Sequence, residues 1–351
     1  MRFLIDILHP AHVHFFRNFV AEMEQSGHEV MITARSKECV VDLLDQYGLS
    51  YTLISSQKKG ALGLASEMVS RSWALMGIAR RFRPDFMTGI MGPSIAVVGK
   101  ALPSSKTVIF YDTEMARITN WFAYPLADWV CTPSCYQTPV RGTHITYEGY
   151  HELAYLHPDR FVPDADLLPR LGVAEGEPYY VVRFVSWEAS HDVGELGFSL
   201  EGKRRLVDEL EAHGKVFISS ELQLPEDLAA RVPDIHPTEM HSLLASARML
   251  VAESATMASE CAVLGVPSVY VAKTSRGYID EQAARYDLVH IFDHSQEQDA
   301  MAKALQLAAD PQLAQRAAAA RARLLDERID VTGWMVDFFS DPTAQRRKVS
   351  L

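Results

Sequence analysis

Three histidines lie close together near the start of the chain, in the segment His9-Pro10-Ala11-His12-Val13-His14. An imidazole titrates near neutral pH, so it can take a proton from a hydroxyl group or donate a hydrogen bond to a phosphate. We interpret His12 as a candidate catalytic base and His9 as a candidate substrate-binding residue. Capping and packing roles are the alternatives. A metal site is disfavoured because no acidic residue follows closely enough to complete one.

Two carboxylates, Asp112 and Glu114, follow the apolar segment 107–111. A carboxylate at the end of a strand can orient an acceptor hydroxyl or act as its base. The alternative is a capped turn in which Asp112 accepts hydrogen bonds from backbone N–H groups. Both residues therefore remain candidate catalytic residues.

A second group of polar residues lies between an apolar strand at 248–252 and a helix predicted at 257–264. The amino end of a helix offers free N–H groups and a favourable dipole to an anion. Ser254 and Thr256 can add hydroxyl donors, and Glu260 can accept from a sugar hydroxyl. We interpret these residues as a grip for the diphosphate and ribose of a nucleotide sugar, with simple N-capping as the alternative.

Arg183 lies within the apolar run 179–185, and an arginine in such a run needs a partner, because burying its charge alone is costly. A diphosphate is one candidate partner and Asp192 is another. Ser219 ends a later apolar segment and could line the pocket for the nucleotide base. Arg183 and Ser219 are therefore candidate nucleotide-binding residues.

Alternating apolar segments and amphipathic helices must position these groups. In the first part of the chain, apolar segments of buried-strand type recur at 3–8, 29–34, 50–54, 86–90, 107–111 and 129–131. A helix is predicted at 15–26, directly after the histidine segment. This alternation predicts an open, doubly wound, mostly parallel sheet whose carboxyl edge collects the candidate residues.

A second alternating series begins after a proline-containing stretch. Strands are predicted at 179–185, 216–219, near Ile235, at 248–252, 268–272 and 288–292. We therefore predict an α/β protein with two Rossmann-like domains facing a cleft. The predicted divisions are an acceptor-side domain at 1–157, a linker at 158–178, a nucleotide-sugar domain at 179–330, and a terminal helix at 331–351 that could pack back on the first domain.

Composition limits the function. The 351 residues suit two domains, and the formal net charge of −11 argues against nucleic acid as the main partner. No signal peptide or apolar run long enough to span a membrane is present, and four scattered cysteines suggest no disulfide framework, so we expect a cytoplasmic protein. Dinucleotide, P-loop and nucleophile-elbow motifs are missing. The one Asp-x-Asp pattern, Asp164-Ala165-Asp166, lies in the proline-containing linker and does not follow a predicted strand, which favours metal-independent chemistry without a cofactor.

Several segments together resemble a known family. DILHPAHVHFFRNF, FYDTEMARITNWFAYPLADWVCTPSCY, YEGYHELAYLHPDRF, VVRFVSWEASHDVG and ESATMASECAVLGVPSVYV are similar to the domain-of-unknown-function 354 family. The last of them also resembles the donor motif of the GT-B superfamily of MurG-type glycosyltransferases and UDP-N-acetylglucosamine 2-epimerases. The resemblance implies that Ser254 and Thr256 hold phosphate and Glu260 holds the ribose. It places His12 where related transferases have a histidine, although His-Pro-Ala-His stands here instead of glycines.

We therefore expect a metal-independent glycosyltransferase with an NDP-sugar donor, UDP being the expected nucleotide. Its acceptor would be a cell-surface glycan or a lipid-linked precursor. One alternative is a UDP-sugar 2-epimerase, with Asp112, Glu114 and His191 as its acid–base residues. The other is a protein that binds a nucleotide sugar or polysaccharide without turnover. Ser254-Ala255-Thr256 replaces the Ser-Gly-Gly of many epimerases, which favours the transferase.

Overall fold

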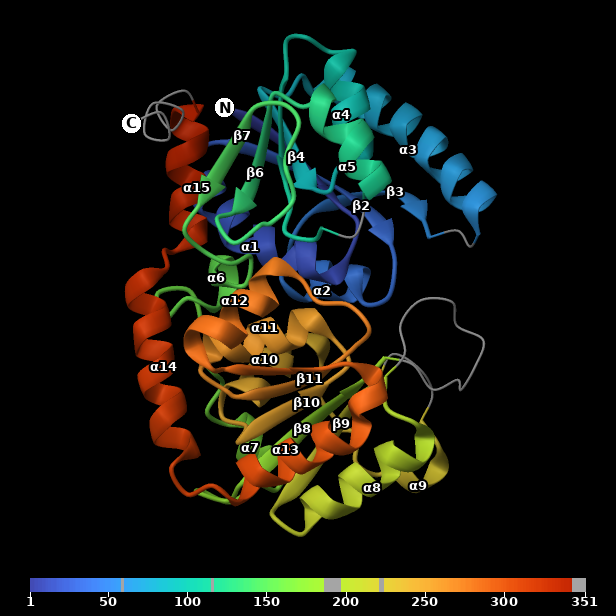
Figure 1. The fold of residues 1–351 in the computed structure, drawn as a ribbon. Helices are drawn as coiled ribbons and strands as arrows, with labels where there is room; N and C mark the ends of the chain where they lie inside the picture. The colour runs from blue at the N-terminus through green and yellow to red at the C-terminus, as the bar shows by residue number, and fades with distance from the viewer. Residues whose placement is uncertain (58–59, 115–116, 186–196, 221–223, 343–351) are drawn as a thin grey trace. The chain divides into compact units, whose positions relative to one another are not determined.

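The computed structural model describes residues 1–57, 60–114, 117–185, 197–220 and 224–342 (Figure 1). The chain forms two compact units. The first contains residues 1–155 and 329–351, and the second contains residues 156–328. Each unit is built on its own parallel sheet, which confirms the predicted class of two doubly wound α/β domains.

The sheet of the first unit has seven parallel strands in the order β3-β2-β1-β4-β5-β6-β7. The strand order reverses between β1 and β4, so the switch point of this sheet lies beside the loop that contains the histidines. The strands are β1 (Arg2–Ile7), β2 (Glu29–Ser36), β3 (Tyr51–Ser56), β4 (Phe86–Ile90), β5 (Lys106–Phe110), β6 (Trp129–Pro133) and β7 (His144–Tyr147).

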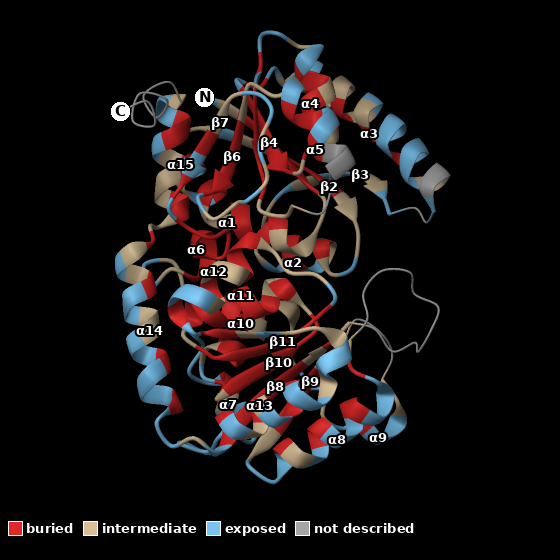
Figure 2. Cartoon of the chain, viewed as in Figure 1, coloured by how far each residue is buried: buried red, intermediate tan, exposed pale blue. Residues whose placement is uncertain are grey.

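Helices cover both faces of this sheet (Figure 1). They are α1 (Pro10–Gln25), α2 (Val40–Gln46), α3 (Ala61–Phe82), α4 (Pro93–Lys100), α5 (Arg117–Ala123), the short helix η1 (Tyr124–Leu126) and α15 (Val331–Ser340); α6 (Leu153–Leu156) lies at the boundary of the unit. The buried residues lie mainly along the strands and the inner faces of these helices (Figure 2).

Two features of the first unit differ from the prediction. The first is β7, a seventh strand that the Tyr- and acid-rich composition around it obscured. The second is the start of α1, which begins at Pro10 and not at residue 15. Proline fits the first position of a helix because its fixed φ suits the helix and no N–H is needed there. His12 and His14 therefore belong to the helix itself.

The terminal helix α15 packs against α1 within the first unit. Its Phe339 contacts the aromatic rings of Phe3, Phe19 and Phe86, with centroid distances of 5.4, 5.1 and 5.2 Å. These contacts tie the end of the described chain to the first strand and the first helix.

The sheet of the second unit has five parallel strands in the order β12-β11-β10-β8-β9. Its switch point lies between β8 and β10. The strands are β8 (Tyr179–Phe184), β9 (Lys215–Ser220), β10 (Met249–Ala252), β11 (Ser268–Val271) and β12 (Val289–Phe292). Residues near Ile235, where a strand was predicted, form an irregular segment that leads into η2 (Pro237–Glu239).

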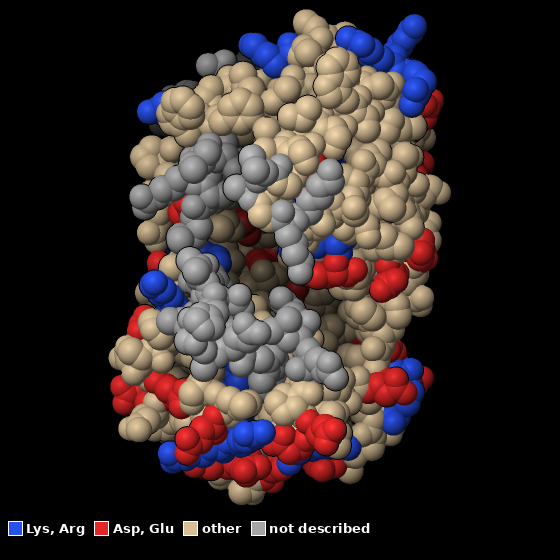
Figure 3. Space-filling view, turned by 90° about the vertical axis from the view of Figure 1, so that its right-hand side faces the viewer, with Lys and Arg blue, Asp and Glu red and all other residues tan. Residues whose placement is uncertain are grey.

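Longer and shorter helices alternate with these strands. They are α7 (Leu167–Arg170), α8 (Leu200–Glu211), α9 (Glu226–Ala229), α10 (Met240–Ala245), α11 (Ala255–Leu264), α12 (Gly277–Tyr286), η3 (His294–Gln296), α13 (Glu297–Ala309) and α14 (Leu313–Glu327). Acidic and basic side chains alternate over the face of this unit shown in Figure 3, which matches exposed ion pairs such as Arg204–Asp227 and Arg231–Glu211.

No helix in the described ranges is both long enough and apolar enough to cross a membrane.

Candidate active site

The first histidines lie at the switch point of the first unit. His9 is the N-cap of α1, and its Nδ1 accepts a hydrogen bond from the backbone N–H of Ala11 at 3.3 Å. His12 lies in the first turn of α1 and is buried, and its Nδ1 accepts from the backbone N–H of Leu8 at 3.3 Å. Capping and positioning are thus part of what these two imidazoles do.

Both imidazoles are held in the neutral form. Burial lowers the pKa of His12 well below its ordinary value, and nearby positive charge on His9 and His151 lowers it further. Burial and Lys37 likewise lower the pKa of His9 to about 4. Since Nδ1 of His12 is an acceptor, its proton sits on Nε2, and this imidazole is a hydrogen-bond donor at neutral pH.

His151 lies at the same edge, but its Nδ1 faces a carboxylate instead of a backbone N–H group. Nδ1 of His151 lies 3.1 Å from Oδ2 of Asp112, while the hydroxyl of Thr113 donates to Oδ1 of Asp112 at 2.9 Å. A carboxylate this close to Nδ1 favours a proton on that nitrogen and a lone pair on Nε2. Nε2 of His151 is buried and has no hydrogen-bond partner among the described residues.

Aromatic rings and a close backbone approach hold His151 in place. The ring of Phe15 lies 4.5 Å from the imidazole, and the ring of Tyr147 stacks over it at 6.4 Å. Gly149 leaves room for Val331 at the start of α15, since a Cβ at this glycine would lie 2.6 Å from a Val331 methyl group. The Tyr147 hydroxyl is also buried without a hydrogen-bond partner in the described chain. This hydroxyl and Nε2 of His151 could therefore both form hydrogen bonds with a polar ligand.

The other first-unit residues have structural contacts. Glu114 accepts a hydrogen bond from the backbone N–H of Gln137 at 3.2 Å, which ties together two loops of the carboxyl edge. His14 is buried, and its ring packs 5.4 Å from that of Tyr155. Beside β1, the turn after β4 contains Met91 with a φ of 64°, a left-handed conformation that non-glycine residues rarely adopt.

In the second unit, Arg183 lies at the carboxyl end of β8, directly beside the switch point. Its Nη1 donates to the hydroxyl of Ser219 on β9 at 2.8 Å, and the two residues pair in register. On its other side, Arg183 pairs with Ala252 of β10, two residues before Ser254. The sheet thus brings Arg183, Ser219 and Ser254 to one edge.

Ser254 is the N-cap of α11, and its hydroxyl accepts from the backbone N–H of Met257 at 3.4 Å. Thr256 is half-buried in the first turn. The first N–H groups of a helix have no acceptor within it, so this turn can still receive an anion. Capping and anion binding are therefore compatible at α11.

Glu260 is buried in the middle of α11, where His241 of α10 contacts it. Nε2 of His241 lies 2.9 Å from Oε1 of Glu260, and the exposed fractions of the two side chains are 3% and 6%. Oε1 of Glu260 is thus engaged inside the protein.

Glu253, directly before the N-cap, connects the α11 turn to the segment after β8. Its Oε2 and Oε1 accept from the backbone N–H groups of Val185 and Phe198, both at 2.8 Å, and Nζ of Lys203 lies 3.1 Å from Oε1. Burial lowers the pKa of Lys203, while Glu253 opposes this effect. Val185 and Phe198 are thereby held close to the candidate anion site. His191 lies outside the described residues.

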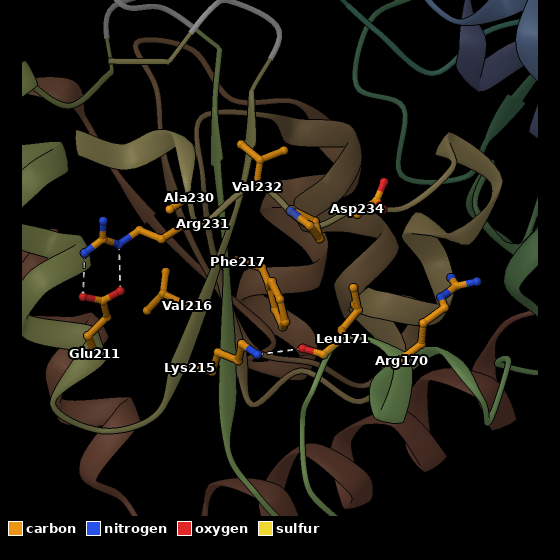
Figure 4. A pocket seen from close by; sticks show the side chains of 11 residues that line it. Arg170, Leu171, Glu211, Lys215, Val216, Phe217, Ala230, Arg231, Val232 and Asp234 are labelled. Atoms are coloured by element: carbon orange, nitrogen blue, oxygen red, sulfur yellow. Dashed lines mark hydrogen bonds and ion pairs between the residues drawn. The ribbon is translucent and has the colours of Figure 1, made fainter. Parts of the chain in front are cut away.

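Two open hollows in the described part of the second unit lie elsewhere. One, of about 440 Å³, is at the start of β9, where Arg231 pairs with Glu211 and Lys215 donates to the carbonyl of Leu171 (Figure 4). The other, of about 790 Å³, includes Tyr179 and Arg248, at the start of β8 and just before β10. Both are at the amino ends of the strands, whereas ligands of such sheets bind at the carboxyl ends.

Sequence reasoning missed three residues of these edges: His151, Glu253 and His241. A signal for His151 was available in TYEGYHELAYL, a segment too rich in polar and aromatic residues for an ordinary linker. Glu253 could have been noticed as a carboxylate next to an N-cap. Nothing in the sequence connects His241 with Glu260, because their contact depends on how α10 packs on α11. Among the described residues, no group of three His, Cys, Asp or Glu side chains could hold a metal ion.

Comparison with known proteins agrees with this architecture. The family model described as "Protein of unknown function (DUF354)" matches residues 1–282. An uncharacterized protein of Methanocaldococcus jannaschii is 24% identical over 277 residues, which cover 76% of this chain and 80% of that protein.

Among solved structures, spinosyn forosaminyltransferase SpnP is similar with a TM-score of 0.66 and 17% identity, covering 97% of this chain and all of that one. UDP-GlcNAc 2-epimerase from Neisseria meningitidis, bound to UDP-GlcNAc, has a TM-score of 0.63 and 10% identity, covering 90% and 94% of the two chains. At these identities the likeness establishes the fold, which is of the GT-B type.

Proposed function

Since the chain belongs to the DUF354 family and has the GT-B fold, we propose that it is a metal-independent glycosyltransferase with a nucleoside diphosphate sugar as donor. The expected nucleotide is UDP, and the expected location is the cytoplasm. The proposed acceptor is a hydroxyl group of a glycan or of a lipid-linked precursor. No bound cofactor takes part.

The main support is the pair formed by Asp112 and His151. A buried imidazole with a carboxylate on Nδ1 and a vacant lone pair on Nε2 has the geometry of a general base. In the proposed reaction Nε2 of His151 takes the proton of the acceptor hydroxyl as its oxygen attacks the anomeric carbon. The bond from that carbon to the diphosphate oxygen breaks, and the nucleoside diphosphate leaves with the electron pair. Asp112 stabilises the imidazolium ion that results.

The role we assign to His12 is that of a donor. Its neutral imidazole presents the Nε2 proton, because Nδ1 already accepts from Leu8. A donor beside the base can hold a sugar or phosphate oxygen in position without competing for the acceptor proton. His9 and Glu114 keep supporting roles at this edge, His9 as the cap of α1 and Glu114 as the tie to Gln137.

For the nucleotide we assign the carboxyl edge of the second unit. Negative charge develops on the departing diphosphate, and fixed donors at that position lower the barrier. Arg183 supplies a guanidinium whose Nη1 is oriented by Ser219, and the first turn of α11 supplies N–H groups and the Thr256 hydroxyl. Glu260 is the proposed acceptor for a ribose hydroxyl.

An epimerase is the second candidate, since the fold is shared with a UDP-GlcNAc 2-epimerase. That reaction also needs an acid–base residue and a diphosphate grip. The two activities differ in their products. An epimerase converts UDP-GlcNAc to its 2-epimer without any acceptor, whereas a transferase releases UDP and consumes the sugar.

The test is to incubate the protein with a panel of NDP-sugars and follow nucleotide release and sugar configuration by NMR. We expect UDP release that increases with added glycan or lipid-linked acceptors and that His151→Gln abolishes, while UDP binding by calorimetry is retained. Appearance of a 2-epimer without acceptor would replace the transferase with the epimerase. UDP binding without any turnover across the panel would indicate a binding protein.

A further inference from the structure

The long helix α3 of the first unit has an unusual distribution of polarity. Its two charged residues in the first half, Glu67 and Arg71, are buried. Arg71 forms an ion pair with Asp6 of β1 and donates to the hydroxyl of Ser55 at 2.6 Å, and Ser55 donates to Glu67 at 3.0 Å. These two charges of the first half of α3 therefore face inward, where they link the helix to the sheet.

Four large apolar side chains of α3 are nevertheless exposed to solvent, alongside exposed serines. Leu64, Met68, Val69 and Trp73 have exposed fractions of 47, 39, 55 and 73%. A water-facing helix normally places its charged residues outside and its apolar residues inside. The outer side of α3 reverses this pattern over about three turns.

Two exposed aromatic residues continue this surface on α5. Trp121 and Phe122 have exposed fractions of 64 and 39%. Helix α4 packs against both α3 and α5, and the three helices lie side by side on one face of the sheet (Figures 1 and 2). We call the six exposed residues Leu64, Met68, Val69, Trp73, Trp121 and Phe122 the α3–α5 face.

The exposed charges on the three helices themselves are of one sign. In a chain with 45 acidic and 34 basic residues, α3, α4 and α5 together contain a single acidic residue, the buried Glu67. Their exposed charges in the described chain are basic: Arg80 and Arg81 at the end of α3, and Lys100 at the end of α4. Figure 3 shows Lys and Arg above a broad upper surface that has few charged side chains.

We propose that the α3–α5 face docks the protein on an anionic lipid bilayer. Exposed tryptophans favour the boundary between headgroups and acyl chains, and neighbouring basic residues attract anionic lipids. A second copy of the chain fits less well. An isologous contact through these helices would bring the arginines of both copies together without an exposed acidic residue on the same helices to offset them. The proposal is independent of the catalytic assignment.

The test is flotation of the intact chain with vesicles of phosphatidylcholine containing about one third phosphatidylglycerol, compared with pure phosphatidylcholine. We expect binding to the anionic vesicles that weakens with salt, with quenching of tryptophan fluorescence by brominated lipid. Trp73→Ser combined with Trp121→Ser should lower the partition coefficient about tenfold or more. Arg80→Glu combined with Arg81→Glu should abolish the preference for anionic vesicles.

A matched control is Val162→Ser, which removes a side chain that is 84% exposed in the second unit. This variant should bind vesicles like the unaltered chain. The proposal is overturned if the unaltered protein stays with the soluble fraction at low salt, or if Val162→Ser loses as much binding as the tryptophan pair. A further result would also overturn it: sedimentation velocity shows that the unaltered protein is a dimer and that Trp73→Ser is a monomer, and neither protein binds vesicles.

Discussion

Replacing Asp112 by asparagine tests the proposed chemistry most directly. The substitution keeps the size of the side chain but removes the negative charge 3.1 Å from Nδ1 of His151. The amide can present its NH₂ group to Nδ1, which favours the tautomer with the proton on Nε2. In that tautomer His151 cannot take a proton from a substrate hydroxyl, and the imidazolium ion loses its counter-charge.

The expected loss follows from these two effects. Positioned general-base catalysis contributes about 10²- to 10⁴-fold to the rate, equivalent to about 3–5 kcal/mol of barrier. Because Asp112 acts through His151, Asp112→Asn should lower kcat by about two to four orders of magnitude. KM for the donor should change little, because the residues assigned to the nucleotide lie on the second unit.

The assay is UDP release from the best NDP-sugar, with UDP affinity measured by calorimetry and folding checked by thermal denaturation. Glu114→Gln is the matched control. It removes another carboxylate of the same edge, whose Oε1 accepts a hydrogen bond from the backbone N–H of Gln137. We expect a change of less than about tenfold for this control. An Asp112→Asn protein that is folded and as active as the unaltered chain would refute the role of the pair.

The other predictions concern binding and stability. Arg183→Ala should weaken UDP binding about tenfold or more in calorimetry, and an unchanged affinity would contradict the proposed diphosphate position. Glu253→Gln should lower the free energy of unfolding by about 3–5 kcal/mol in urea because it breaks the buried ion pair with Lys203, and adding Lys203→Met should restore part of the loss. The pKa of His12 is lower in the folded chain than in the unfolded chain, so the unfolded chain binds more protons as pH falls through about 6.5. The free energy of unfolding should therefore decrease by about 1.4 kcal/mol between pH 7.5 and pH 5.5. His12→Gln should remove this part of the pH dependence, and an equal dependence in the variant would contradict it.

The fold was predictable because its periodicity is strong. Every strand of the two sheets except β7 coincides with an apolar segment recognised in the sequence, and the parallel order follows from the alternation with helices. β7 was missed because its four residues, His144 to Tyr147, alternate buried and partly exposed positions and lack a continuous apolar run. The strand predicted near Ile235 failed because prolines flank that residue and favour turns.

The candidate site was only partly predictable. Residues that follow strands, such as Asp112 and Arg183, could be placed on the carboxyl edges from their position in the chain. The partner of Asp112 could not be predicted, because His151 lies 39 residues further along the chain. Its position depends on the close packing of Gly149 against Val331, which the sequence does not reveal. Tautomers also lie beyond sequence reasoning, because they depend on which ring nitrogen meets which backbone or carboxylate atom.

In the proposed mechanism His12 and His151 have opposite tautomers and therefore different roles. If both imidazoles were protonated, their charges would repel, and the pKa of His12 is lowered in part by His151 for this reason. Of these two histidines, His151 has a carboxylate beside Nδ1, whereas Nδ1 of His12 accepts from the backbone N–H of Leu8. In this proposal the new positive charge forms on the imidazole of His151, while the Nε2–H group of His12 continues to donate its hydrogen bond to the substrate. A His12→Ala variant should therefore bind substrate more weakly yet keep a pH–rate profile of the same shape, whereas His151→Ala should lose the rate itself. A changed profile in His12→Ala would mean that the base had been assigned to the wrong histidine.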